Sequence, residues 1–501
     1  MYFSKSKYCG LWQCPKIAWL DKYKPEEREK DEALDARLDT GNDVGDLAMG
    51  LFGDFVEVTA KREDGKMDIP KMIERTKEEM AKDTPVICEA SFEYNGLYCA
   101  VDILKRDGDG WAIYEVKSST DPEKTVYHAD VAYQKYVLEH CGVCVTKTYL
   151  VTVNNQYVFD GTLDIEKLFN ITDVSDLVED QKTFVGPNLE AAEPMLNSAD
   201  EPDIDLSERC FDPYHCAFWK YCTRNLPTPS VFDLYWFGPA KSLPLYHDGV
   251  ISYEELEASD VKLSETNRRI IDFALHDRGI YVDKNSLSKF LKSFTYPLYF
   301  LDFESMQPAV PKYIGTRPYM QICFQYSLHY IEEEGGELKH KEFLAEPEED
   351  PRRALCESLC RDIPKDVDVV VFNNTFECTR LKEMAEAFPD LADHLLNICN
   401  NIVDLLVPFR SGWYYKREIG NSFSIKSVLP ALCPDDPALD YHALDQVHHG
   451  GEAMTIFPAM ADMTPEERAR TRENLLKYCC LDTLAMVKVW EVLKKECRMR
   501  N

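Results

Sequence analysis

Two acidic residues and a lysine lie on neighbouring strands that we predict in the first half of the chain. Asp102 falls in the segment AVDIL, and Glu115 and Lys117 follow in YEVKS. Alternation along a strand puts Glu115 and Lys117 on one face, and a hairpin brings Asp102 beside them. Two carboxylates and a carbonyl suit Mg²⁺ or Mn²⁺, and a nearby lysine can orient the attacking water. The pattern therefore indicates metal-dependent hydrolysis at phosphorus.

A second group of acids is spread over the second half of the chain. Asp302 and Glu304 lie two residues apart in LDFES and share one face of a predicted strand. Tyr478 and Asp482 lie four residues apart in YCCLD and share one face of the final helix. Acids from a strand, another element and a late helix that converge on one point make a two-metal site. Two further acids are candidates for the fourth acidic ligand of this two-metal site: Glu377 in FNNTFE and Asp404 in NIVDLL.

Four cysteines bracket the first half of the chain. Cys210, Cys216 and Cys222 are separated by two five-residue gaps with interleaved aromatic residues, and Cys14 in QCPK supplies a fourth thiol, with Cys9 in reserve. Four thiolates fit either a structural zinc ion or an iron–sulfur cluster. We call these four cysteines and the metal that they would bind the cysteine staple. It would tie the amino terminus to the far end of a domain, so its loss is expected to unfold that domain.

The three groups of residues described above need a framework of strands and helices. In the first half we predict strands at 86–94, 96–106 and 110–119, then a helix at 130–142 that ends at a glycine. A β-rich run at 144–155 follows. These elements place Asp102 and the acid–lysine pair on adjacent strands.

The second half opens another α/β unit. We predict a strand at 296–305, a hairpin at 320–345, a buried strand at 367–374 followed by a helix from 375, and a final helix at 473–493. We expect the hairpin to turn at Gly335 and Gly336. The first strand and the last helix carry the acids of the second group.

The sequence between these two α/β regions has a different composition. Residues 226–244 are rich in proline and turn residues, and the text that follows is typical of a helical connector. We therefore predict domains at 1–225 and 296–501, both α/β, with a partly helical connector at 226–295.

Composition indicates a soluble globular protein. Apolar residues make up 45% and charged residues 29% of the 501 residues. No apolar run approaches the length of about 20 residues that a membrane span needs, and the amino terminus lacks the pattern of a secretory signal. We expect a cytoplasmic protein that does not interact with a membrane.

The first acidic group resembles the core of the PD-(D/E)XK nuclease superfamily, in which an acid, a spacer and an acid-x-lysine stand on strands. Gln134 and Tyr136 in DVAYQKYVLEHCG resemble the glutamine–tyrosine motif of its RecB-like members. The resemblance implies that Asp102 and Glu115 bind the metal and that Lys117 and Gln134 belong to the catalytic site.

RecB-like nucleases usually carry a histidine on an early helix as a further metal ligand. The candidate segment TGNDVGDLAMGLFG has none, and Asp43 or Asp46 is the substitute. Glu89, at the start of the preceding strand, is a candidate for additional acidic support. The cysteine arrangement is similar to the iron–sulfur staple of CRISPR-associated RecB-like nucleases and of AddB-type helicase–nucleases, which implies a 4Fe-4S cluster. Those families commonly have a closer first pair in the carboxyl-terminal triplet, so zinc stays an alternative.

The order of acids in the second half resembles the DEDD exonucleases on their RNase H-like fold. Asp302 and Glu304 match the first motif, and Asp482 with Tyr478 matches the last. In that family the tyrosine positions the attacking water. The helix after the second strand usually carries aspartate, whereas this sequence has Glu377 there. The resemblance implies digestion from a free 3′ end.

The basic and aromatic residues of GWYYKREIGNSFSIKSVLP have two interpretations. They form either a surface that stacks and holds a single strand or a loop with a buried aromatic anchor. The residues concerned are Trp413, Tyr414, Tyr415, Lys416, Arg417 and Lys426.

The whole combination resembles an uncharacterised bacterial family that fuses an iron–sulfur RecB-like nuclease to a DEDD-type exonuclease. It implies a nuclease that uses Mg²⁺ or Mn²⁺ at both sites and acts on nucleic acid, DNA in preference to RNA, single-stranded or with free ends. The rival hypothesis is a nucleic-acid-binding or adaptor protein with one or both nuclease domains inactive. The net charge of −31 favours the rival, because phosphate binding normally rests on a basic surface. The complete acid-x-lysine and tyrosine–aspartate sets favour the enzyme.

Overall fold

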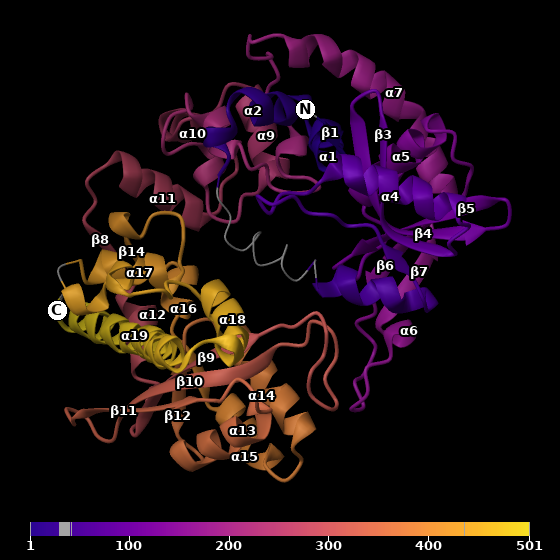
Figure 1. Ribbon diagram of the computed structural model, residues 1–501. Helices are drawn as coiled ribbons and strands as arrows, with labels where there is room; N and C mark the ends of the chain where they lie inside the picture. The colour runs from indigo at the N-terminus through magenta and orange to yellow at the C-terminus, as the bar shows by residue number, and fades with distance from the viewer. Residues whose placement is uncertain (1, 30–40, 42, 435, 500–501) are drawn as a thin grey trace. The chain divides into compact units, whose positions relative to one another are not determined.

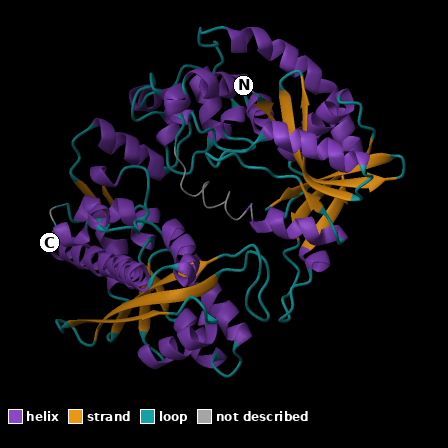
Figure 2. Cartoon of the chain, in the orientation of Figure 1, coloured by secondary structure: helices purple, strands orange, loops and turns teal. Residues whose placement is uncertain are grey.

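The computed structural model describes residues 2–29, 41, 43–434 and 436–499. The chain forms two compact units, Met1–Asn225 with Pro308–Met320, and Leu226–Gln307 with Gln321–Asn501. Both are α/β, one around a mixed seven-stranded sheet and the other around a mixed five-stranded sheet, and helices cover both sheets (Figure 2). The expected connector at 226–295 belongs to the second unit.

The sheet of the first unit has the order β2-β3-β4-β5-β6-β7, and β1 pairs in parallel with β4 (Figure 1). The β3-β4-β5 ribbon is antiparallel, β5 and β6 are parallel, and β7 returns antiparallel to β6. The strands are β1 (Phe3–Ser4), β2 (Val56–Glu57), β3 (Val86–Tyr94), β4 (Leu97–Asp107), β5 (Gly110–Lys117), β6 (Val145–Val153) and β7 (Phe169–Asp173).

Two apolar cores cover the two faces of this sheet. On one face, α5 packs against strands β3 to β6 and against α1 and α7. The opposite core includes Val44, Ala112 and Tyr114, and Ala309 from the inserted segment Pro308–Met320. The helices are α1 (Lys5–Gln13), α2 (Pro15–Tyr23), α4 (Ile69–Ala81), α5 (Thr125–His140), α6 (Ile165–Leu168), α7 (Ser175–Asn197) and α8 (Trp219–Thr223).

The sheet of the second unit has the order β11-β10-β9-β12-β13. Strand β10 is antiparallel to both β9 and β11, whereas β12 runs parallel to β9 on one side and to β13 on the other. A separate pair joins β8 to β14. The strands are β8 (Ile280–Val282), β9 (Leu298–Met306), β10 (Ile322–Ile331), β11 (Leu338–Leu344), β12 (Asp368–Val371), β13 (Ile402–Asp404) and β14 (Tyr414–Lys416).

The two faces of β9 meet different helices. Tyr299, Leu301 and Phe303 join the core that α13, α14 and α15 cover. Alternation therefore turns Asp302 and Glu304 toward α18 and α19, which pack on the other face (Figure 1). The helices are α9 (Pro239–His247), α10 (Tyr253–Ala258), α11 (Glu265–Leu275), α12 (Lys284–Leu291), α13 (Pro351–Asp362), α14 (Thr375–Ala387), α15 (Ala392–Asn400), α16 (Val407–Arg410), α17 (Ile425–Leu432), α18 (Gly450–Ala459) and α19 (Pro465–Met499).

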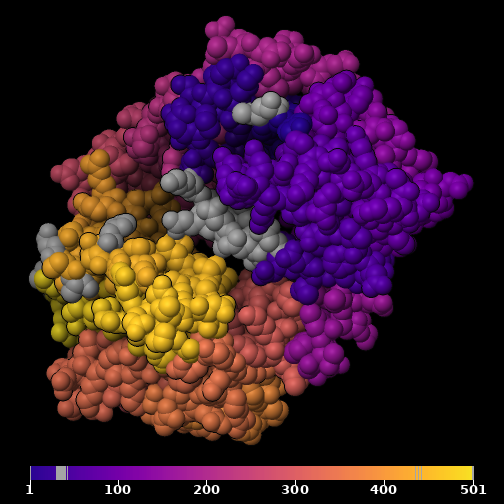
Figure 3. All heavy atoms as spheres, viewed as in Figure 1, coloured from indigo at the N-terminus to yellow at the C-terminus, as the bar shows by residue number. Residues whose placement is uncertain are grey.

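The carboxyl-terminal helix α19 is longer than its apolar pattern predicts. It begins at Pro465 instead of near residue 473. Thr464 and Glu467 form a reciprocal cap there, since the Thr464 N–H donates to the Glu467 carboxylate and the Glu467 N–H donates to Thr464 Oγ1. The carboxyl-terminal segment, yellow in Figure 3, adjoins the orange residues of the same unit.

The other predicted elements are confirmed with shifts at their ends. The strand predicted at 86–94 coincides with β3, and the helix predicted at 130–142 begins earlier, at Thr125. The hairpin of β10 and β11 turns at Gly335, whose positive φ of 77° suits glycine. Among the described residues, no helix is long and apolar enough to cross a membrane.

Candidate active sites

Three acids stand side by side on the central strands of the first unit. The pairs Cys88↔Ile103 and Ala90↔Val101 flank Glu89 and Asp102, which are therefore opposite each other on β3 and β4. The pair Ile103↔Tyr114 continues the register, so Asp102 is opposite Glu115 on β5. Glu89 has a φ of +57°, a left-handed conformation that non-glycine residues rarely adopt within a strand. The sheet thus brings together the acids that the sequence analysis singled out.

Helix α5 supplies the polar groups that face these acids. Gln134 Nε2 donates to Glu115 Oε2 at 2.8 Å and to Asp130 Oδ1 at 3.1 Å. Lys117 Nζ donates to Glu115 Oε1 at 2.8 Å and to Asp130 Oδ2 at 2.6 Å. Asp130 was missed by the sequence analysis, although it lies four residues before Gln134 and hence on the same helical face. The side-chain oxygen Oε1 of Gln134 is buried without a hydrogen-bond partner.

A second lysine, which the sequence analysis also missed, bridges the two carboxylates. Lys5, at the start of α1, places Nζ 3.2 Å from Asp102 Oδ1 and 2.9 Å from Glu115 Oε1. Its separation of 97 residues from Asp102 leaves no local signal in the sequence. A cation that binds both carboxylates has to displace this ammonium group.

Burial and neighbouring charges give these acids different pKa values. Burial, and then the Glu115 charge, raises the pKa of Asp102 to about 6. Burial, followed by the Asp102 charge, raises the pKa of Glu89 to about 7. Burial would also raise the pKa of Glu115, but Lys117 and Lys5 outweigh it and hold that pKa well below its ordinary value. The pKa of Lys117 is raised because Asp130 and Glu115 outweigh the effect of burial. Glu115 is therefore the permanently ionised member of the group.

Two other predicted contributors lie elsewhere. Asp43 and Asp46 are exposed, and residues 43–48 bury Val44 and Ala48 in the core on the sheet face opposite Glu115. Thr40 and Asn42 of the same segment lie outside the described residues. The Tyr136 ring contacts His140 in a tilted arrangement, 4.1 Å between centroids, and lies against Gly186 of α7. Neither the aspartates nor the tyrosine joins the acidic group.

The four predicted cysteines lie near one another at the junction of α1 and α2, where Cys14 stands. Burial, and then Cys210, Cys222 and Cys14, raises the pKa of Cys216 to about 11. The pKa of Cys210 is raised by burial and by Cys14, so the thiols interact electrostatically across the first unit. Cys9 belongs to the acidic group instead, since its pKa is raised by burial and then by Asp130.

Hydrogen bonds fasten the amino terminus to the cysteine segment. Gln13 Nε2, next to Cys14, donates to the carbonyls of Arg209 at 2.8 Å and Tyr214 at 2.7 Å. The Glu29 N–H donates to the Ala217 carbonyl at 2.8 Å. The two ends of the first unit are therefore held together beside the four thiols.

In the second unit, a cavity of about 190 Å³ opens between β9 and α19. Strand β9 supplies two acids and α19 supplies one acid and a tyrosine. The lining consists of Asp302, Glu304, Phe372, Ile425, Lys426, Tyr478, Asp482 and Met486.

Two residues that were not among the predicted catalytic residues, Tyr441 and Lys426, organise this cavity. Tyr441 donates its hydroxyl to Asp482 Oδ1 at 2.6 Å. Lys426 lies over the rings of Tyr441 and Tyr478, at 5.3 and 5.1 Å from their centroids, and donates to the His448 carbonyl at 2.7 Å. Tyr441 had no signal in the sequence, because it lies in a short 3₁₀ segment between helices.

The aromatic stretch before Lys426 takes the second of its two interpretations. Tyr414 and Tyr415 are 1% and 3% exposed, so they are part of the core. Tyr415 donates its hydroxyl to the Gly420 carbonyl, and Lys416 donates to the Ala431 carbonyl. Lys426 is the member of this stretch that lines the cavity.

Burial raises the pKa of each of the three cavity carboxylates, and neighbouring carboxylates add to the rise for Asp302 and Glu304. Burial raises the pKa of Asp302 well above its ordinary value, with further contributions from Asp482, Glu304 and Glu377. Burial, and then Asp482, raises the pKa of Glu304 to about 8. Burial raises the pKa of Asp482 to about 6, and the Tyr441 hydrogen bond opposes that rise. Such a group is fully ionised only beside a compensating positive charge.

The two candidates for the remaining acid differ in their surroundings. Glu377, at the start of α14, interacts with Asp302, and its Oε2 is buried without a hydrogen-bond partner. Asp404 ends β13, and its Oδ1 accepts the backbone N–H groups of Asn373 and Leu406, both at 2.9 Å. Neither residue lines the cavity. Because one oxygen of Asp404 is already used as a backbone anchor, whereas Glu377 interacts electrostatically with Asp302, Glu377 is favoured as the fourth acid.

Comparison with known proteins covers parts of the chain. Residues 299–424 match a family model described as a domain of unknown function, DUF2779. The match contains β9 with Asp302 and Glu304 and ends before α19. An uncharacterized protein of Ureaplasma parvum serovar 3, UU173, is 26% identical over 313 residues. The aligned region makes up 57% of this chain and 44% of that relative, so this chain matches less than half of the relative's length.

Proposed function

We propose that this chain is a nuclease dependent on Mg²⁺ or Mn²⁺, with one active site in each unit. The observation that carries the proposal is the gathering of Asp302, Glu304 and Asp482 with Tyr478 around one cavity. We assign the second unit to RNase H-like exonucleases of the DEDD type that digest from a 3′ end. We assign the first to PD-(D/E)XK nucleases of the RecB-like group. Nucleic acid, DNA in preference to RNA, is the proposed substrate.

The second site fits divalent cations by the chemistry of its donors. All the acids offer hard oxygen ligands, and one ligand atom from each of Asp302, Glu304 and Cys479 lies within 4.8 Å of the others. Glu377, whose Oε2 is buried without a hydrogen-bond partner, interacts electrostatically with Asp302 and is the further oxygen ligand that we propose. Cations would relieve the repulsion that raises these pKa values.

The residues of the second site have separate tasks in the proposed reaction. Asp302, Glu304, Glu377 and Asp482 would bind the cations, which supply charge stabilisation and a more acidic water. Tyr478 keeps its proton, because burial raises its pKa and the Asp482 charge raises it further. Its hydroxyl can therefore orient the attacking water. The Lys426 ammonium lines the cavity, where it can contact a phosphate oxygen.

In the first site, Asp102 and Glu115 would bind the cation and Lys117 would face the scissile phosphate. The donors fit a hard cation once Lys5 moves aside, since its ammonium contacts both carboxylates. Gln134 holds Glu115 in place through the 2.8 Å hydrogen bond. The lysine contact makes this site the weaker support for the proposal.

The cysteine staple fits an iron–sulfur cluster better than one zinc ion. Thiolates around a tetrahedral zinc lie about 3.8 Å apart, given Zn–S bonds of about 2.3 Å. Among the described residues, the groups whose ligand atoms lie within 4.8 Å of one another do not include these four thiols. Four thiolates also suit a 4Fe-4S cluster, to which the resemblance in the sequence points. The cluster would hold the first unit together.

A direct assay tests the proposal. Labelled single- and double-stranded DNA and RNA are incubated with the protein and Mg²⁺, Mn²⁺ or a chelator. We expect metal-dependent cleavage by the wild type and none by the double variant Lys117→Arg, Asp302→Asn. The Lys147→Arg, Asp393→Asn protein is the matched control, because both residues are exposed. Binding without cleavage under every condition would support the adaptor hypothesis and overturn this one.

A further inference from the structure

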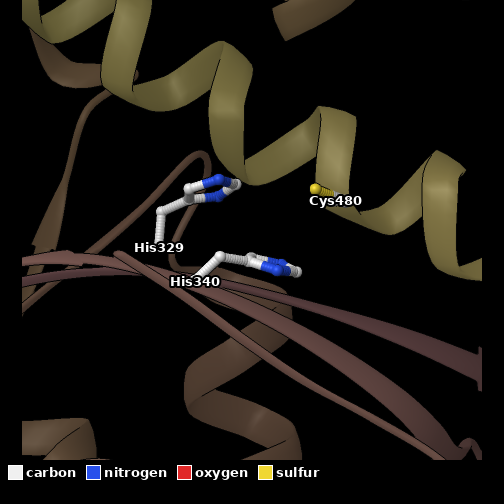
Figure 4. Close-up of side chains that lie close together, drawn as sticks. All are labelled: His329, His340 and Cys480. Atoms are coloured by element: carbon white, nitrogen blue, oxygen red, sulfur yellow. The ribbon is translucent and has the colours of Figure 1, made fainter. Parts of the chain in front are cut away.

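A second group of metal-type ligands lies in the second unit, away from the cavity with the acids. His329 on β10 and His340 on β11 are directly paired across the antiparallel ladder, with ring centroids 4.5 Å apart. Cys480 faces them from α19 (Figure 4). One ligand atom from each of the three residues lies within 4.8 Å of the others. Two imidazoles and a thiolate are the donors that zinc prefers.

Hydroxyl groups hold both imidazoles through their other nitrogens. His329 Nδ1 is 2.8 Å from Thr483 Oγ1, and His340 Nε2 is 2.9 Å from Ser327 Oγ. The two hydroxyls are linked to each other at 2.7 Å. This leaves Nε2 of His329 and Nδ1 of His340 for a ligand. Metal-binding histidines are oriented in this way by a hydrogen bond from the second ring nitrogen.

The group opens onto a cavity of about 500 Å³. His340 and Cys480 line it together with Glu342, which follows His340 by two residues and shares its face of β11. His329, beside His340, is buried at 5% exposure. An ion therefore has a path of entry and an open position beyond the three protein ligands.

We propose that His329, His340 and Cys480 form a zinc site, with a fourth position open to the cavity and within reach of the Glu342 side of β11. The site is separate from the proposed nuclease centres and does not depend on them. Zinc there joins the β10–β11 hairpin to α19, the helix that also carries Tyr478 and Asp482. The ion would thus fix the helix against the sheet through Cys480, which lies between Tyr478 and Asp482 in the sequence.

Metal counting on the full chain tests this site. Chelator-treated protein is titrated with Zn²⁺ for stoichiometry and with Co²⁺ for the thiolate-to-metal absorption band. We expect Cys480→Ser and His340→Gln each to bind one equivalent less zinc than the wild type. Cys360→Ser, a cysteine on α13 in the same unit, is the control and keeps the full complement. The comparison removes the contribution of the cysteine staple, which all four proteins share.

Two further measurements separate a lost ligand from a damaged fold. Thr483→Val keeps all three ligands and removes the hydroxyl that holds His329, so the zinc affinity should fall about 10–100-fold. Zinc should raise the Tm of the wild type and of Cys360→Ser but not of Cys480→Ser. Equal zinc stoichiometry in wild type, Cys480→Ser and His340→Gln would overturn the proposal, whatever the nuclease assay shows.

Discussion

Lys117 illustrates how a single side chain can serve both stability and reaction. Its place at the end of a predicted strand suggests that removing the side chain changes the free energy of unfolding only slightly. In the structure its ammonium pairs with Glu115 at 2.8 Å and Asp130 at 2.6 Å, and only 19% of the side chain is exposed. Removing one partner of a buried pair leaves uncompensated charge. The fold and the proposed reaction therefore depend on the same contacts.

Two substitutions of Lys117 should separate these roles. Lys117→Ala should lower the free energy of unfolding by as much as about 3–5 kcal/mol. Lys117→Arg keeps the charge and should preserve most of the stability, while cleavage by the first site falls because the guanidinium cannot take the same position. Thermal unfolding and cleavage by a protein that also carries Asp302→Asn measure both effects. Lys147→Ala, which removes an exposed ion pair with Asp173, should change stability by no more than about 0.5 kcal/mol. Equal stability of Lys117→Ala and wild type would contradict the buried-pair argument.

The crowded acids of the second site predict a dependence of stability on pH. Glu304 and Glu377 have pKa values of about 8 in the folded chain, raised from 4.5. The folded state therefore keeps protons that the unfolded chain releases. The stability from this effect is fully present below about pH 4.5 and is lost as the pH rises toward 8. Without metal, the Tm of the second unit should fall between pH 5 and pH 8, by about 2–4 °C per kcal/mol lost. Addition of Mg²⁺ or Mn²⁺ should reverse the fall.

Asp302→Asn tests the same cluster from the chemical side. Loss of one carboxylate should lower exonuclease turnover on the order of 100-fold or more, since a ligand of the cations is removed. In the absence of metal, the variant should be as stable as wild type or more stable at pH 8, because one repelling charge is gone. Asp393→Asn, at an exposed position of α15, should change neither property. Unchanged turnover in Asp302→Asn would remove this carboxylate from the proposed mechanism.

At the scale of elements, α1 and α2 connect the two ends of the first unit. Lys5 at the start of α1 reaches the acids, whereas Gln13 and Cys14 at its end meet the cysteine segment. The helix thus spans from the proposed nuclease site to the staple. Disruption of the staple should therefore disturb the site as well as the fold.

Cys216→Ser tests the staple. Anaerobically purified wild type should be brown, and the variant should lose the broad iron–sulfur absorption and unfold at a lower temperature, because a long loop is no longer closed. Cys144→Ser, which changes an exposed cysteine of the same unit, should keep colour and Tm. If metal analysis finds no iron in the wild type and one equivalent of zinc less in Cys216→Ser than in the wild type, the four cysteines bind zinc instead of a cluster.

At the scale of the whole molecule, the two proposed sites stand in different units. Asp102 belongs to the first unit and Asp302 to the second. A substitution in one site should therefore abolish the activity of that site and leave the other site active. With Lys117→Arg, the remaining activity should require a free 3′ end and release mononucleotides, so a 3′-blocked strand should persist. With Asp302→Asn, cleavage should no longer distinguish the two substrates. Equal digestion of blocked and free strands by Lys117→Arg would exclude the proposed polarity.

The sequence by itself determined most local elements and the composition of both acidic groups. Strand alternation placed Asp302 with Glu304, and helical spacing placed Tyr478 with Asp482, because these periods are set by the backbone alone. The elements β3, β9 and α19 were predicted for the same reason. Cysteine spacing likewise pointed to the staple without any knowledge of the fold.

Only the tertiary structure decided which side chains meet. Lys5 contacts Asp102 across 97 residues, and Tyr441 donates to Asp482 across 41 residues, distances over which no periodic pattern extends. Glu377 is favoured over Asp404 as the fourth acid because two backbone N–H groups already donate to the Asp404 carboxylate. The facing histidines of the proposed zinc site likewise follow from hairpin register and from the packing of α19. Such contacts are fixed by the packing of helices on sheets, which local periodicity does not encode.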